Sequence, residues 1–108
     1  MAAQTRSASL LIVPRIALPE VAGPIARISG RPEAGLEAAR RLLRTPGIRL
    51  VDLDRRLLAE ALVIAARLRL RGADAVYVAA ARRLRVPLVT WDQQLLQRAA
   101  AVVQVLHP

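Results

Sequence analysis

Two aspartates stand in surroundings that are unusual for a charged side chain. Asp74 lies between Ala73 and Ala75, and Asp92 follows the apolar segment 87–91. Both need an explanation, because charged groups are rarely placed among apolar neighbours without a partner or a metal ion. Two converging carboxylates supply the hard oxygen ligands that divalent cations prefer, and such a cation can activate water for hydrolysis. The pattern therefore predicts a divalent-metal site.

The elements that carry these aspartates can bring them together. The sequence predicts a helix from Asp74 to about Leu84, followed by a short buried strand that ends at Thr90. A helix that runs antiparallel to the following strand has its start level with the end of that strand. Asp74 and Asp92 are 18 residues apart in the sequence, but we expect them to be neighbours in space.

The rest of the chain alternates short apolar runs with stretches of helical periodicity. The expected strands are 9–13, 48–51, 88–90 and 102–106, and the other expected helices are 18–29, 32–44, from Asp52 or Asp54 to about 70, and 93–101. This alternation favours a single α/β domain over 1–108, with a short parallel sheet flanked by helices. Residues 1–8 are expected to be disordered or to extend a sheet edge, and Pro24 is expected to distort its helix.

The composition points to a polyanionic partner. All 17 basic residues are arginine, against 8 acidic ones, which gives a net charge of +9. Arginine suits phosphate, so nucleic acid is the first candidate and an acidic protein the second. A coding bias that enriches both Ala and Arg is the alternative origin of the arginines, although it leaves the charge unchanged. Most of them are expected on solvated helix faces.

Several chemistries are excluded by residues that the chain lacks. There is no Cys, so a thiol nucleophile, a disulfide and a zinc-thiolate site are excluded. The single histidine, His107, lies next to the last residue, which argues against a histidine-based triad. No segment has the roughly 20 consecutive apolar residues that a membrane span needs, so we expect a soluble, cytoplasmic protein.

Four segments, in this order, resemble the PIN-domain family and specifically its VapC-type toxin ribonucleases. They are LPEVA at 18–22, VDLD at 51–54, LRGADAVYVA at 70–79 and PLVTWD at 87–92. The resemblance implies a PIN-like three-layer fold and a Mg²⁺- or Mn²⁺-dependent endoribonuclease. It further implies a homodimer that a separate antitoxin protein neutralises. By motif, Glu20, Asp74 and Asp92 match three of the family's acidic metal-binding and catalytic positions.

The chain also departs from the family pattern. Family members usually begin with a central strand that carries an essential Asp, followed by one or two helices, before the strand predicted here at 9–13. Only eight residues precede that strand, and none is acidic. We therefore expect an N-terminally truncated PIN-like domain. A start codon assigned too late or a decayed gene is favoured over a shortened protein kept for another use.

Each candidate residue also has a structural interpretation. Asp74 and Asp92 can cap the helices that follow them, and Glu20 can stabilise the first turn of its helix. Thr90 can bond a carboxylate or a metal-bound water, or be an ordinary strand residue. Tyr77 and Trp91 can stack on bases or pack in the core or at its rim. These alternatives leave two hypotheses: a metal-dependent endoribonuclease, or a non-catalytic truncated PIN-like module that binds nucleic acid or a partner protein.

Overall fold

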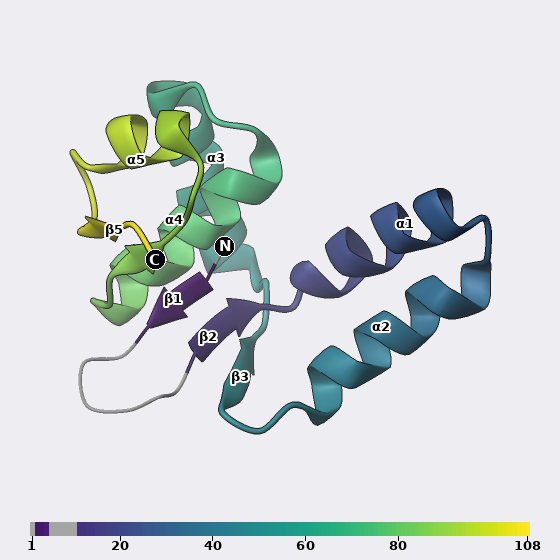
Figure 1. Ribbon diagram of the computed structural model, residues 1–108. Coiled ribbons are helices and arrows are strands. Elements are labelled where there is room, and N and C mark those ends of the chain that lie inside the picture. The colour runs from purple at the N-terminus through teal and green to yellow at the C-terminus, as the bar shows by residue number, and fades with distance from the viewer. Residues whose placement is uncertain (1, 5–10) are drawn as a thin grey trace.

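The computed structural model describes residues 2–4 and 11–108, and it contains five helices and five short strands within them (Figure 1). In chain order the elements are β1 (Ala2–Gln4), β2 (Leu11–Pro14), α1 (Ala17–Ser29), α2 (Pro32–Arg44), β3 (Ile48–Val51), α3 (Arg55–Leu68), α4 (Gly72–Leu84), β4 (Leu88–Val89), α5 (Gln93–Ala99) and β5 (Val105–Leu106). The expected α/β class is therefore confirmed. None of the described helices is long and apolar enough to cross a membrane.

The strands form one mixed sheet in the order β3-β2-β1-β4-β5. The outer pairs, β2 with β3 and β4 with β5, are parallel, whereas β1 is antiparallel to both of its neighbours. Because β1 reverses direction against both β2 and β4, the other four strands all run the same way. Their carboxyl ends therefore lie at one edge of the sheet, and the segments that follow them meet there.

Residues 2–4 differ from the expectation of disorder or of an edge extension. They form the central strand, in which Ala3 pairs with Ile12 on one side and with Leu88 on the other. An antiparallel strand satisfies the backbone groups that β2 and β4 would otherwise leave unpaired, and this explains the departure from a wholly parallel sheet. Residues 1 and 5–8 of the predicted tail, and 9 and 10 of the predicted strand 9–13, lie outside the described residues.

Helix α4 is the centre of the core. All seven residues from Ala75 to Ala81 are buried, and the helix contacts β1, β2 and β4 on the sheet and α3 on its other side. The small alanines let neighbouring elements approach closely, while Val76, Tyr77 and Val78 supply the bulk. A helix that is apolar all round must be enclosed in this way. Its rigid position fixes Asp74, in its first turn, relative to the sheet.

Helices α1 and α2 form a hairpin that extends from the body of the molecule (Figure 1). Helix α1 continues through Pro24, where the sequence predicted a distortion. Its C-cap is Gly30, whose φ of 70° is the left-handed conformation that glycine favours. The two helices touch at Gly35, where a side chain would meet the Ala22 carbonyl oxygen. The hairpin leaves Ile28 84% exposed.

Two helices end on arginines in the left-handed conformation. Arg69 closes α3 and Arg85 closes α4, each with a φ of 56°. Glycine is the usual residue at such positions, because a side chain there crowds the backbone. Gly72 is the first residue of α4 and does not take this role.

Candidate active site

Asp74 and Asp92 lie in one small pocket, as their placement in the sequence predicted. The pocket has a volume of about 60 Å³ and lies between the start of α4, the segment after β4 and the start of α5. We call it the carboxylate pocket; it is lined by Arg69, Leu70, Arg71, Asp74, Asp92, Gln94, Leu95 and Arg98. A space of this size accommodates a few water molecules or an ion that keeps part of its water shell.

Asp92 has a structural role as the N-cap of α5. Its Oδ1 atom accepts hydrogen bonds from the backbone nitrogens of Gln94 at 2.9 Å and Leu95 at 3.2 Å, so it caps the N-terminus of α5. No such bond is made by its Oδ2 atom within the described chain, and this oxygen can accept a further ligand. The capping interpretation of Asp92 is therefore correct, but it uses only half of the carboxylate.

Thr90 stabilises the turn that leads to Asp92. It is buried, and its Oγ1 atom accepts a hydrogen bond from the backbone nitrogen of Asp92 at 3.1 Å. Within the described residues the Thr90 side chain makes no other hydrogen bond. Thr90 therefore bonds the backbone of Asp92 and not a carboxylate. Thr90 therefore shapes the turn that carries Asp92 into the pocket.

Asp74 is positioned differently. It occupies the first turn of α4, where the helix dipole favours a carboxylate, and it does not cap the helix. Its side chain is 19% exposed, and its partner is Arg71, whose Nε atom lies 3.8 Å from Oδ2. Because Arg71 is itself largely exposed, this ion pair is weak and leaves the carboxylate available to a ligand.

Glu20 reaches the same region through Tyr77. Burial raises the pKa of the Tyr77 hydroxyl well above its ordinary value, and the neighbouring Glu20 carboxylate raises it further. The charge of Asp74 acts in the same direction. Tyr77 therefore lies near both Glu20 and Asp74, and its 5% exposure makes it a core residue, as one of the two sequence interpretations had it. Trp91, in contrast, is 72% exposed at the rim.

The three predicted acidic residues thus lie in one region without forming a single ligand group. Within residues 2–4 and 11–108, no three Asp, Glu, His or Cys side chains are arranged to hold one metal ion together. The central strand β1, AAQ in sequence, contributes no carboxylate. Mg²⁺, however, commonly binds through one or two carboxylates and keeps several waters. The oxygen donors of Asp74 and Asp92 fit such a water-rich site, whereas Glu20 does not line the pocket.

Three arginines line the same pocket, and the sequence did not predict them as site residues. Arg69, Arg71 and Arg98 surround the two aspartates, and Arg98 donates a hydrogen bond through Nη1 to the Arg69 carbonyl at 2.8 Å. Three arginine residues against two aspartates give the residues that line the pocket a positive net charge, which favours a phosphate over an isolated cation. Their gathering depends on α3, α4 and α5 meeting in space, for which the sequence gives no local signal.

Comparison with known proteins places the chain in a family. The family model of the PIN domain matches residues 2–102, nearly the whole chain, and the protein therefore belongs to the PIN domain family. Most members of this family are nucleases, generally dependent on Mg²⁺. No curated protein sequence matches the chain.

Proposed function

We propose that this protein is a Mg²⁺-dependent endoribonuclease and the toxin of a toxin–antitoxin pair. The observation that supports this most directly is the shared pocket of Asp74 and Asp92, at the sheet edge where the strands end, in a chain that belongs to the PIN domain family. The charge of +9 suits a polyanionic substrate. A cytoplasmic location goes with this proposal.

In this proposal the acidic residues of the pocket would bind the metal, and its arginines would bind the RNA substrate. Asp74 and the free Oδ2 of Asp92 would hold Mg²⁺ or Mn²⁺, with Glu20 as a further ligand or as the partner of a metal-bound water. A bound Mg²⁺ lowers the pKa of its water and neutralises charge on the phosphate. Arg69, Arg71 and Arg98 would bind phosphate oxygens of the RNA and hold the scissile bond beside the aspartates.

Cleavage of a structured RNA by the purified protein tests this proposal. We expect cutting in the presence of Mg²⁺ or Mn²⁺ and none after addition of EDTA, because the carboxylates alone cannot activate water. Cutting that persists in EDTA would remove the metal from the mechanism. Cutting should also be tested on single-stranded DNA, since the family assignment by itself leaves the choice of nucleic acid to experiment.

The second candidate is a non-catalytic module that binds nucleic acid or a partner protein. Two observations favour it: no three-ligand group is formed among the described residues, and the pocket has more arginines than aspartates. This candidate predicts salt-sensitive RNA binding without cutting, with or without Mg²⁺. Cleavage and binding assays on the same purified protein therefore distinguish the nuclease from the non-catalytic module.

The surface also offers a place for the antitoxin. An apolar groove of about 380 Å³ follows α3 and α4; it is lined by Ile16, Leu53, Leu58, Ala61, Leu62, Ala65, Gly72, Ala73 and Val76. Because the chain carries a net charge of +9, we propose that the antitoxin inserts an amphipathic helix with acidic flanks. Leu62 is 70% exposed, so Leu62→Asp should leave cutting intact and abolish inhibition by a co-expressed antitoxin.

A homodimer is the remaining partner proposal. The projecting hairpin exposes large apolar side chains, namely Ile25, Ile28, Leu36 and Leu43, and two copies could cover them. Light scattering of the purified protein should give twice the monomer mass, and Ile28→Glu should return the mass to that of one chain. A monomeric mass for the unaltered protein would refute the dimer.

A further inference from the structure

The end of α4 opposite Asp74 presents two arginines without acidic partners. Arg83, which lies between them in sequence, donates to Asp54 at 3.3 Å and to Glu60 at 3.2 Å. Both of these carboxylates are thereby paired with Arg83. Arg82 and Arg85 are exposed and make no ion pair with any described residue. Their guanidinium groups are therefore free to bind an anion from outside the chain.

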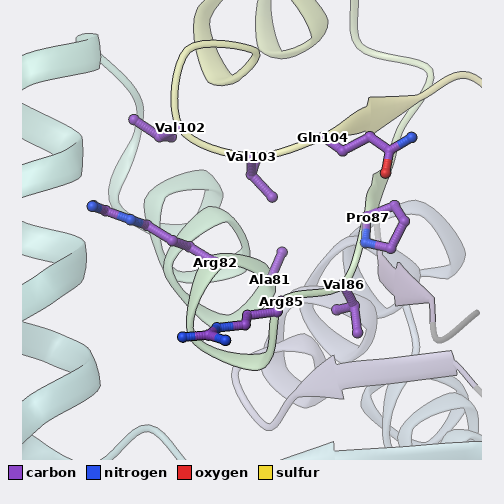
Figure 2. Close-up of a pocket in the computed structure, with 8 residues that line it drawn as sticks. All are labelled: Ala81, Arg82, Arg85, Val86, Pro87, Val102, Val103 and Gln104. Carbon is purple, nitrogen blue, oxygen red and sulfur yellow. The ribbon is translucent and has the colours of Figure 1, made fainter.

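The two free arginines flank a hollow of mixed character. The hollow has a volume of about 260 Å³, and Pro87, Val102, Val103 and Gln104 line it together with Arg82 and Arg85. Figure 2 shows the two arginine side chains leaving the end of α4 on the same side, while Val103 points into the hollow. An apolar floor beside guanidinium groups can take a nucleotide, with its base on the floor and its phosphate on the rim.

A second hollow continues the same surface. It has a volume of about 490 Å³, is lined by Arg56, Glu60, Arg82, Arg83 and Arg85, and so shares Arg82 and Arg85 with the first. Four cations face one anion there, and Glu60 already pairs with Arg83 and Arg56. The net charge of this surface is therefore positive, and it extends beyond a single phosphate.

The backbone at Arg85 gives a separate reason to regard its side chain as functional. Arg85 adopts the left-handed conformation, with φ 56° and ψ 45°, at the end of α4. Glycine is the residue that this position favours, and any other side chain costs stability. A strained residue that carries an unpaired charge beside a hollow is a reasonable site for binding.

We propose that Arg82 and Arg85, with the hollow between α4 and β5, form a second binding subsite for the phosphates of single-stranded RNA. This subsite rests on the proposed RNA substrate and adds a location outside the carboxylate pocket. Helix α4 connects the two places: at about 1.5 Å per residue, Asp74 and Arg82 are about 12 Å apart along it. At about 3.4 Å per stacked nucleotide, four nucleotides cover about that length. Because residues 75–81 of α4 are buried, an RNA must follow the surface around the helix and needs more than four.

An acidic protein segment is the competing occupant, and the observations favour RNA. A carboxylate-rich peptide would need only the arginines, whereas the apolar floor and the Gln104 amide beside them suit a base with polar edges. The planar guanidinium also matches a phosphate in geometry as well as charge.

RNA binding without cutting tests the subsite. Protein carrying Asp74→Asn is titrated in EDTA with a labelled RNA of roughly 12 nucleotides, over about 50–200 mM salt. Adding Arg82→Gln and Arg85→Gln should weaken binding roughly tenfold at low salt. Because each phosphate contact to a single strand contributes about 0.7 to the salt slope, the slope should fall by about 1.4.

The matched control removes the same charge elsewhere. Arg27 and Arg31, at the tip of the α1–α2 hairpin, are exposed and form no ion pair with a described residue, so Arg27→Gln with Arg31→Gln should leave the salt slope unchanged. An equal fall in both double variants would overturn the subsite and leave only a general charge effect. If the arginine variants bind RNA normally but lose a polyglutamate peptide, the surface serves an acidic protein. If no variant binds RNA at all, the RNA substrate itself fails.

Arg85→Gly separates binding from folding. The substitution relieves the left-handed backbone, so it should raise the Tm by roughly 4–8 °C while it weakens RNA binding. A purely structural role for Arg85 predicts that stability and binding change in the same direction, or that binding does not change. Arg69→Gly, at the equivalent end of α3, should raise the Tm in the same way and serves as the control for the backbone effect.

Discussion

The hydroxyl of Thr90 lies 3.1 Å from the backbone nitrogen of Asp92 and accepts its hydrogen. This bond holds the turn after β4 and thereby sets the direction in which the Asp92 carboxylate leaves the chain. Thr90, which directly follows β4, therefore acts on the site through the backbone of Asp92.

Replacing Thr90 by valine tests that bond, because the two side chains have nearly the same shape. We expect Thr90→Val to destabilise the protein by about 1 kcal/mol, since the Asp92 N–H loses its acceptor. Hydrogen exchange of the Asp92 amide should accelerate in this variant. Thr90→Ser keeps the hydroxyl and should keep the amide protected, although it loses a buried methyl group. Equal protection in both variants would show that the bond does not form in solution.

Two substitutions separate the capping role of Asp92 from its proposed metal role. Asn caps a helix as well as Asp does, so Asp92→Asn should unfold at nearly the same denaturant concentration as the unaltered protein, whereas Asp92→Ala should lose about 1 kcal/mol. Both should abolish Mg²⁺-dependent cutting, because neither offers a charged Oδ2. Full cutting by Asp92→Asn would reduce Asp92 to a helix cap.

Asp74 makes fewer structural contacts, so its removal should affect the chemistry alone. Asp74→Asn breaks only the exposed pair with Arg71, and we expect a change of less than about 1 kcal/mol in the free energy of unfolding. Cutting and Mn²⁺ binding, the latter measured by electron paramagnetic resonance, should both be lost. Asp52 follows β3 at the same sheet edge and pairs with exposed Arg15, so Asp52→Asn is the control and should retain both.

Much of the fold was predictable because local rules decide it. The helix Pro32–Arg44 and the strand Ile48–Val51 have the predicted bounds, since Pro32 suits a first helical turn and 45–47 is a turn. The central strand β1 was not predictable, because a three-residue segment of small and polar residues has no periodicity. Only its pairing with β2 and β4 makes it a strand, and pairing is a non-local property.

The proximity of Asp74 and Asp92 was predictable from the sequence, whereas the arginines beside them were not, and Glu20 does not line their pocket. Asp74 and Asp92 stand out locally, as charges at the ends of apolar segments. Arg98 is an ordinary charge on a short helix, and it enters the pocket only because it bonds to the Arg69 carbonyl on another helix. Such contacts depend on tertiary packing, so the positive balance of the pocket was visible only in three dimensions.

Glycines 35 and 23 should respond oppositely to the same substitution. A Cβ at Gly35 would overlap the Ala22 carbonyl oxygen, so Gly35→Ala should force α1 and α2 apart and cost about 1–3 kcal/mol. Gly23 lies inside α1 with nothing near its would-be Cβ, so Gly23→Ala should stabilise the protein by about 0.5–1 kcal/mol. Urea unfolding measures both. A stable Gly35→Ala protein would mean that the hairpin is packed less closely in solution.

Tyr77 should make stability depend on pH in a window where no other side chain titrates. The chain has one Tyr, no Cys, and only Arg among its basic residues. The unfolded chain releases the tyrosine proton near pH 10, whereas burial and the Glu20 carboxylate raise the pKa of Tyr77 in the folded protein. The stabilisation is therefore complete below pH 10. Above it, the free energy of unfolding should fall by about 1.4 kcal/mol per pH unit until the folded-state pKa is passed.

Tyr77→Phe provides the control for this slope. It removes the ionisable hydroxyl, so the free energy of unfolding of this variant should be insensitive to pH between about 9 and 11. Absorbance of the tyrosinate form gives a direct second measurement, because folded Tyr77 should resist ionisation that the urea-unfolded chain undergoes. Ionisation near pH 10 in the folded protein would show that the Tyr77 hydroxyl is in contact with water and would contradict its burial.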